Sequence, residues 1–150
     1  MRRISIEAVL IGAIVDIVST NILSIPLMVY VVATRHLTAL PKEQISKAFL
    51  EAMQGDPSLM AMQFLVGGGC SILGGYLAAR IAKRDEILNA SLSSFLCVGM
   101  GLYALLFTTI SAPIWKVLLE FVVGPTMAAI GGYIRAATKR DAVVSQPASA

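Results

Sequence analysis

Apolar residues run almost without interruption through four stretches of the chain, about residues 4–34, 57–82, 88–110 and 114–136. Each stretch is at least as long as the roughly 20 mostly apolar residues that an α-helix needs to cross the ~30 Å hydrocarbon layer of a bilayer. The runs are continuous rather than alternating, which argues against β-strands. Since lipid cannot satisfy exposed backbone groups, the pattern predicts an all-α membrane protein, a bundle of four transmembrane helices.

Residues 41–54 are too polar to span and instead have the pattern of a short amphipathic helix. Pro41 suits a first helical turn, and Lys47 and Glu51 lie together on the polar face. We expect this helix outside the membrane, either on the bilayer surface or capping the bundle. Residues 138–150 show no periodicity and are predicted to be a disordered cytoplasmic tail. The apolar face of the external helix would carry Ile45, Phe49, Ala52 and Met53.

The composition agrees with a membrane protein and excludes several soluble classes. Of 150 residues, 57% are hydrophobic and only 14% are charged, whereas about 25% charged residues are usual in a soluble domain. This argues against a water-soluble enzyme domain and a disordered chain. The net charge of +3 is too small for a nucleic-acid-binding face. The expected partners are therefore the lipid bilayer and other membrane helices, with no nucleic acid.

The basic residues predict the orientation of the four spans. An even number of spans puts both termini on one side, and the side with more Lys and Arg is normally cytoplasmic. We therefore expect both the N and the C terminus to be cytoplasmic. Arg2-Arg3 before an apolar run resembles a signal peptide, but this run is too long, carries acidic residues and lacks a convincing cleavage site. The basic residues of the terminal side are Arg2, Arg3, Arg80, Lys83, Arg84, Arg135, Lys139 and Arg140, against Arg35, Lys42, Lys47 and Lys116 on the other side.

Small residues recur at a spacing of four along most of the spans, a pattern typical of closely packed membrane helices. They predict a tight bundle, and an oligomer if one small-residue ridge faces outward. Gly74-Gly75-Tyr76 and Gly131-Gly132-Tyr133 also echo each other, each before a basic cluster. This echo suits either a duplication or the general preference of inward-ending spans for such residues. The predicted packing residues are Gly12, Gly67, Ser71, Gly74, Gly75, Ala79, Gly124, Ala128 and Gly132.

The segment from Gly74 to Ala90 (GGYLAARIAKRDEILNA) resembles one found in uncharacterised small bacterial four-helix integral membrane proteins. The first-span segment from Leu10 to Ile17 is similar to theirs as well. This resemblance implies a multi-pass protein of a bacterial inner membrane, with four spans. It implies no activity, cofactor or site residue.

Asp16 is the most informative polar residue, because it falls near the middle of the first span. A carboxylate there costs several kcal/mol unless it faces the bundle interior, is paired or is protonated. Two interpretations remain open: a proton carrier or cation ligand, or a neutral side chain that hydrogen-bonds across helices. Ser71, Cys97 and Thr126 fall at similar depth. The candidate intramembrane polar site is therefore Asp16, Thr20, Asn21, Ser71 and Thr126.

Nothing in the sequence predicts an enzyme. There is no nucleophile–base pair, phosphate-binding loop or zinc motif, and Cys70, Cys97 and His36 lack metal-ligand spacing. We therefore expect no catalytic residues, no cofactor and no metal. The leading hypothesis is a non-enzymatic accessory or assembly subunit of a membrane complex or homo-oligomer that acts through helix packing. The alternative is a small oligomeric proton-coupled transporter or channel that uses Asp16.

Overall fold

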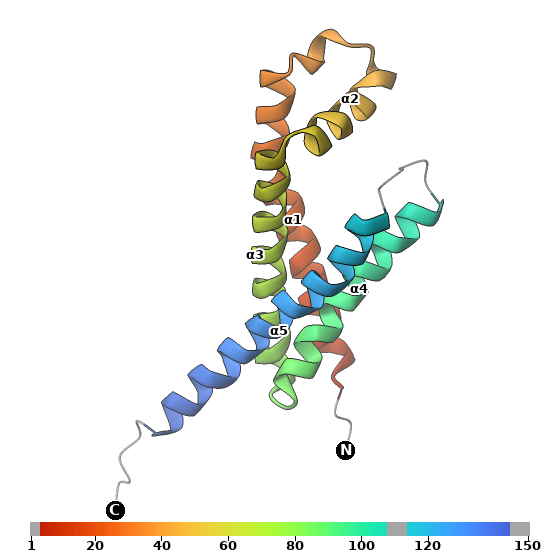
Figure 1. Cartoon of the computed structure of the whole chain (residues 1–150). Coiled ribbons are helices and arrows are strands. Elements are labelled where there is room, and N and C mark those ends of the chain that lie inside the picture. Colours follow the sequence, from red (N-terminus) through yellow and green to blue (C-terminus); the bar gives the residue numbers. More distant parts are fainter. Residues whose placement is uncertain (1–3, 108–113, 145–150) are drawn as a thin grey trace, which may run out of the picture. The chain divides into compact units, whose positions relative to one another are not determined.

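The computed structural model describes residues 4–107 and 114–144. This part of the chain is helical and contains no β-strand, so the predicted all-α class is confirmed. The elements, in chain order, are α1 (Ile6–Thr34), a 3-10 turn (Leu37–Ala39), α2 (Lys42–Gly55), α3 (Pro57–Ala82), α4 (Glu86–Phe107) and α5 (Ile114–Val144) (Figure 1).

The helix bounds follow the predicted spans closely, except at the C-terminal end. The α3 bounds are those predicted, while α1 begins at Ile6 and α2 ends at Gly55. By contrast, α5 continues to Val144, where a disordered tail was expected from residue 138. The helix continues because residues 134–144 are rich in Ala, Lys and Arg, which are good helix formers, and include no Gly or Pro. Residues 108–113, with the predicted tight loop, and 145–150 lie outside the described residues.

Two of the helices, α1 and α3, are long and apolar enough to cross a membrane. In their most apolar windows, only 22% of α1 and 28% of α3 is buried within the protein. A core helix of a soluble protein would bury most of such a window. Lipid or further helices could cover this apolar surface, so the low burial supports membrane association of both helices.

The chain divides into two compact units, and α1 and α3 contribute to both. The hairpin unit is Ser19–Gly67, which holds the end of α1, α2 and the start of α3. The four-helix unit is Met1–Val18 with Gly68–Ala150, which holds the start of α1, most of α3, α4 and α5. Within the four-helix unit, α4 and α5 pack along each other (Figure 1).

In the hairpin unit, one face of α2 packs on the end of α1 and the start of α3. Met53 of α2 is buried with Leu27 and Val31 of α1 and Leu59 of α3. Phe49 and its neighbours on the same face of α2 pack against this cluster. This face of α2 is therefore covered by protein within the hairpin unit. The remaining residues packed on the cluster are Val32, Ala48 and Ala52, and Leu37 of the 3-10 turn completes it.

Asp56 fixes the connection between α2 and α3. Its Oδ1 accepts a hydrogen bond from the backbone N–H of Ser58 at 2.9 Å, which caps the first turn of α3. Its Oδ2 lies 3.2 Å from Nη2 of Arg35, just beyond the end of α1. One carboxylate therefore joins the end of α1 to the start of α3.

Candidate functional site

The candidate site is built on a backbone contact between α1 and α3 in the four-helix unit. A Cβ added to Gly12 would lie 2.7 Å from the Cβ of Ala78 and 2.9 Å from the carbonyl oxygen of Gly74. A Cβ added to Gly74 would lie 2.7 Å from the carbonyl oxygen of Gly12. Side chains cannot approach this closely, so the two glycines set the helix separation. One turn after Gly12, they bring Asp16 against α3.

Asp16 is 6% exposed and meets side chains from two other helices. Its Oδ2 accepts a hydrogen bond from the Ser71 hydroxyl of α3 at 3.0 Å, and Ser71 is also buried. From α4, the Cys97 side chain lies close enough to Asp16 to interact with it electrostatically. The Cys97 Sγ also lies 3.7 Å from the carbonyl oxygen of Ala13 and 3.6 Å from that of Ser93. The carboxyl therefore lies where α1, α3 and α4 meet.

The chemistry of this site is that of a single carboxyl with neutral hydroxyl and thiol neighbours. Burial in apolar surroundings favours the protonated, neutral form of a carboxyl. The protonated group can donate one hydrogen bond and accept others, whereas the ionised group can only accept. The site can therefore hold a proton or act as a hydrogen-bonded link between helices. Both interpretations of Asp16 made from the sequence are compatible with this geometry.

The structure brings Asp16 and Ser71 together and leaves Thr126 apart from that pair. Thr126 is exposed, and its hydroxyl donates to the Val122 carbonyl of its own helix at 2.7 Å. Thr20 and Asn21 continue α1 into the hairpin unit, where Asn21 is exposed. Depth along a span suggested Ser71 and Thr126 alike, but the side that each helix turns toward its neighbours distinguishes them.

Most of the predicted packing glycines of α3 and α5 form close contacts between helices of the four-helix unit. A Cβ on Gly75 would overlap the backbone of Ala128, and a Cβ on Gly132 would lie 2.8 Å from the Cβ of Ala90. A Cβ added to Gly124 would lie 2.9 Å from the hydroxyl oxygen of Ser94. Gly67 differs, because a Cβ there meets nothing within 4 Å. The two alanines of the predicted packing set, Ala79 and Ala128, are fully buried.

Two contacting residues were not among the predicted packing set. Gly131 packs against α3, where an added Cβ would overlap the backbone of Ile72. Asn89, near the start of α4, is fully buried, and its Oδ1 accepts a hydrogen bond from the backbone N–H of Ser5 at 2.8 Å. Gly131 could have been found from its place in the glycine–tyrosine echo. Asn89 could have been found as an amide one turn into an apolar span.

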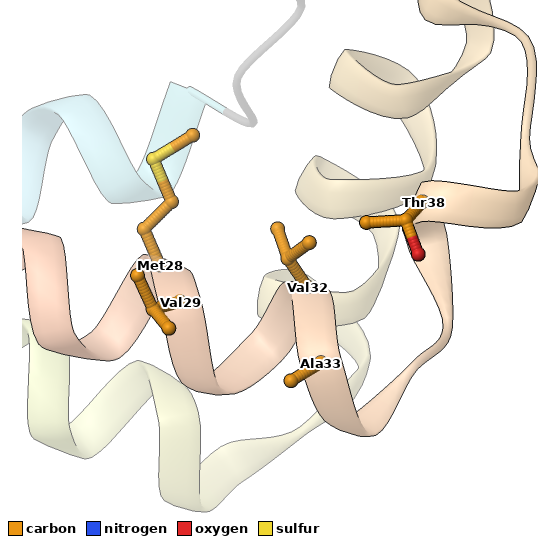
Figure 2. A pocket seen from close by; sticks show the side chains of 5 residues that line it. All are labelled: Met28, Val29, Val32, Ala33 and Thr38. Carbon is orange, nitrogen blue, oxygen red and sulfur yellow. The ribbon is translucent and has the colours of Figure 1, made fainter.

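A shallow apolar hollow lies on the hairpin unit, and the side chains that line it are not titratable. Apart from the Thr38 hydroxyl, the lining side chains are hydrocarbon and thioether, which suits contact with apolar groups rather than a polar substrate (Figure 2). Among the described residues, no group of His, Cys, Asp and Glu could hold a metal ion. The hollow is lined by Met28, Val29, Val32, Ala33 and Thr38.

No protein-family model, curated protein or solved structure matches the chain.

Proposed function

We propose that this chain is a four-span protein of a bacterial inner membrane that binds other membrane helices, as an accessory or assembly subunit. Its partners would be copies of itself or a larger membrane complex. In this proposal α1, α3, α4 and α5 are the spans, and both termini are cytoplasmic. The function is non-enzymatic, and the contacts between helices are the activity.

Large apolar side chains exposed on α4 and α5 support the two further spans. Met100 of α4 is 56% exposed, and Leu118 and Val122 of α5 are 63% and 64% exposed. A soluble monomer rarely carries contiguous apolar surface of this kind, because water makes it costly. Lipid or neighbouring helices remove that cost.

The observation that carries the proposal is the contrast between buried and open glycines. Gly74 and Gly75 make backbone contacts inside the four-helix unit, while Gly99 and Gly101 of α4 are exposed with nothing within 4 Å of an added Cβ. Inside lipid, water does not drive helices together, so close approach through small residues is the main source of helix association. Each open glycine leaves α4 able to accept another helix at the same short separation on its own side, since residues two positions apart in a helix face different directions.

The test is a double variant, Gly99→Leu with Gly101→Leu. It fills the open surface without touching the buried contacts, so we expect a folded protein that no longer co-purifies with its oligomer or complex after mild detergent extraction. Met100→Leu is the matched control, since it keeps a large apolar side chain between the two glycines. Unchanged assembly in the folded double variant would contradict the proposal.

The alternative function, a small oligomeric proton-coupled transporter or channel, is favoured by the buried contact between Asp16 and Ser71. Asp16→Asn keeps the shape and an oxygen acceptor for Ser71 but cannot exchange a proton. In reconstituted vesicles, a transporter would lose flux driven by a pH gradient on this change. An accessory subunit would remain assembled with its usual partners, so the two functions give opposite results.

A further inference from the structure

Arg135 of α5 is partly buried, and its guanidinium carries a nitrogen that lacks a protein partner. Its Nε is a buried side-chain nitrogen with no hydrogen-bond partner among the described residues. A buried polar group without a partner costs on the order of 1–3 kcal/mol, and more if it is charged. Such a group needs an explanation, and an ion or ligand bound at the same guanidinium is one that can be tested.

The position of Arg135 follows from the glycines that precede it. Gly131, one turn earlier, touches the backbone of Ile72 on α3, and Gly132, on the same side of α5, approaches Ala90 on α4. One turn later, Lys139 Nζ lies 3.4 Å from the carbonyl oxygen of Lys83. Arg135 therefore lies on the face of α5 that packs toward α3 and α4.

The neighbouring acidic group does not neutralise Arg135. Glu86 pairs instead with Lys139, at 3.1 Å between Oε1 and Nζ. Asp85, in the turn before α4, is exposed. Of the other charged side chains described at this end of the unit, Glu7 is acidic and exposed. The rest are basic, which leaves an excess of positive charge around Arg135. They are Arg80, Lys83, Arg84 and Arg140.

We propose that Arg135 is the centre of a phosphate-binding site for the headgroup of an acidic phospholipid, with Arg80 and Lys83 as supporting charges. A guanidinium presents several N–H donors in a plane and suits phosphate oxygens well. The turns of α5 just before it expose Ile130, Tyr133 and Ile134. These apolar side chains would lie beside the acyl chains, which is the reason to prefer a lipid to a soluble phosphate. The inference depends on the membrane location proposed above.

The experiment compares the full chain in nanodiscs of phosphatidylcholine with and without phosphatidylglycerol, at about 0.5 M salt. At this ionic strength, diffuse attraction is screened within several ångströms. We expect phosphatidylglycerol to raise the unfolding temperature and to remain bound in native mass spectra. Arg135→Gln should weaken retention of phosphatidylglycerol by about tenfold, the value of one charge-assisted hydrogen-bonding group. Arg135→Lys should restore part of it.

Arg140→Gln is the matched control, since it removes an equal charge from an exposed position on the same helix. It should change retention less than twofold at high salt. Equal losses in the two variants, or equal retention of the two lipids by the wild type, would overturn the site. Displacement of the lipid by millimolar inorganic phosphate would overturn the lipid assignment in favour of a soluble ligand. Failure of the chain to enter phosphatidylcholine nanodiscs would instead contradict the membrane location.

Discussion

Asn89 shows how much one buried amide can organise. Its Nδ2 donates to the carbonyl oxygens of Arg84 and Asp85, each at 3.1 Å, while its Oδ1 accepts the N–H of Ser5. The turn before α4 needs this support, because Lys83 and Asp85 both have positive φ, 59° and 45°. L-residues other than Gly adopt that conformation only at some cost. The amide therefore holds a strained turn and the start of α1 together.

Replacement of this amide is the first prediction. Asn89→Leu should lower the free energy of unfolding by about 2–4 kcal/mol, because it removes the amide's hydrogen bonds to the Arg84 carbonyl and the Ser5 N–H and one of the two that the Asp85 carbonyl accepts. Ser91→Ala is the control, since the Ser91 hydroxyl only bonds to Ile87 of its own helix, and it should cost less than about 1 kcal/mol. Both can be measured by denaturant titration in detergent. An equal effect of the two changes would contradict the role given to Asn89.

At the scale of elements, the junction between α2 and α3 depends on two separate functions of Asp56. The carboxylate caps α3 through Ser58 and pairs with Arg35 at a partly exposed position. A lost cap costs about 1 kcal/mol, whereas an exposed ion pair contributes about 0–1 kcal/mol. The cap should therefore be the larger of the two contributions.

Two substitutions at this position separate the contributions. Asp56→Asn keeps a good capping group and weakens the ion pair, so we expect a loss of at most about 0.5 kcal/mol. Asp56→Ala removes both and should cost about 1–2 kcal/mol. Thermal unfolding of the two variants in the same detergent gives the comparison. If Asn destabilised as much as Ala, the ion pair would be the main contribution.

The glycine contacts between α3 and α5 make a stronger prediction. Gly75→Leu forces a side chain into the backbone of Ala128, which cannot move without separation of the two helices. We expect loss of the folded monomer, seen as aggregation in size-exclusion chromatography after extraction. Gly67→Leu on the same helix meets open space and should leave the elution profile unchanged. A monodisperse Gly75→Leu protein would show that this contact is not required.

The elements were more predictable than the site. The apolar run between Gly55, Pro57 and the polar turn near Arg84 predicts the bounds of α3 closely, because the residues that start and stop a helix act locally in the sequence. The pair of Asp16 and Ser71 follows from similar depth in adjacent spans. Depth along a span does not tell in which direction a side chain points around the helix axis. Thr126 was therefore predicted to join this pair, although it is exposed on α5. The predicted end of α5 is too early, because a polar helix without hydrophobic periodicity has the same sequence pattern as a disordered tail.

At the scale of the whole molecule, the number of spans decides between the possible topologies. The lengths and apolar content of α1 and α3 support two crossings. If α4 and α5 also cross, the segment that joins them is on the same side as α2. If they do not cross, this segment stays on the side of the turn between α3 and α4. A single labelling position between α4 and α5 therefore distinguishes the two arrangements.

The last prediction uses this difference. In a background with Cys70→Ala and Cys97→Ser, we expect a cysteine placed by Ser111→Cys to react with a membrane-impermeant maleimide on intact cells. The four-span proposal puts this position outside, with Lys47→Cys as the positive control. Arg84→Cys should react only after the cells are opened, because its turn is cytoplasmic under the positive-inside rule. Labelling of Ser111→Cys only in opened cells, together with external labelling at position 47, would reduce the molecule to two spans. The exposed glycines of α4 would then lie outside the lipid, and the proposed mode of helix binding would lose its physical basis.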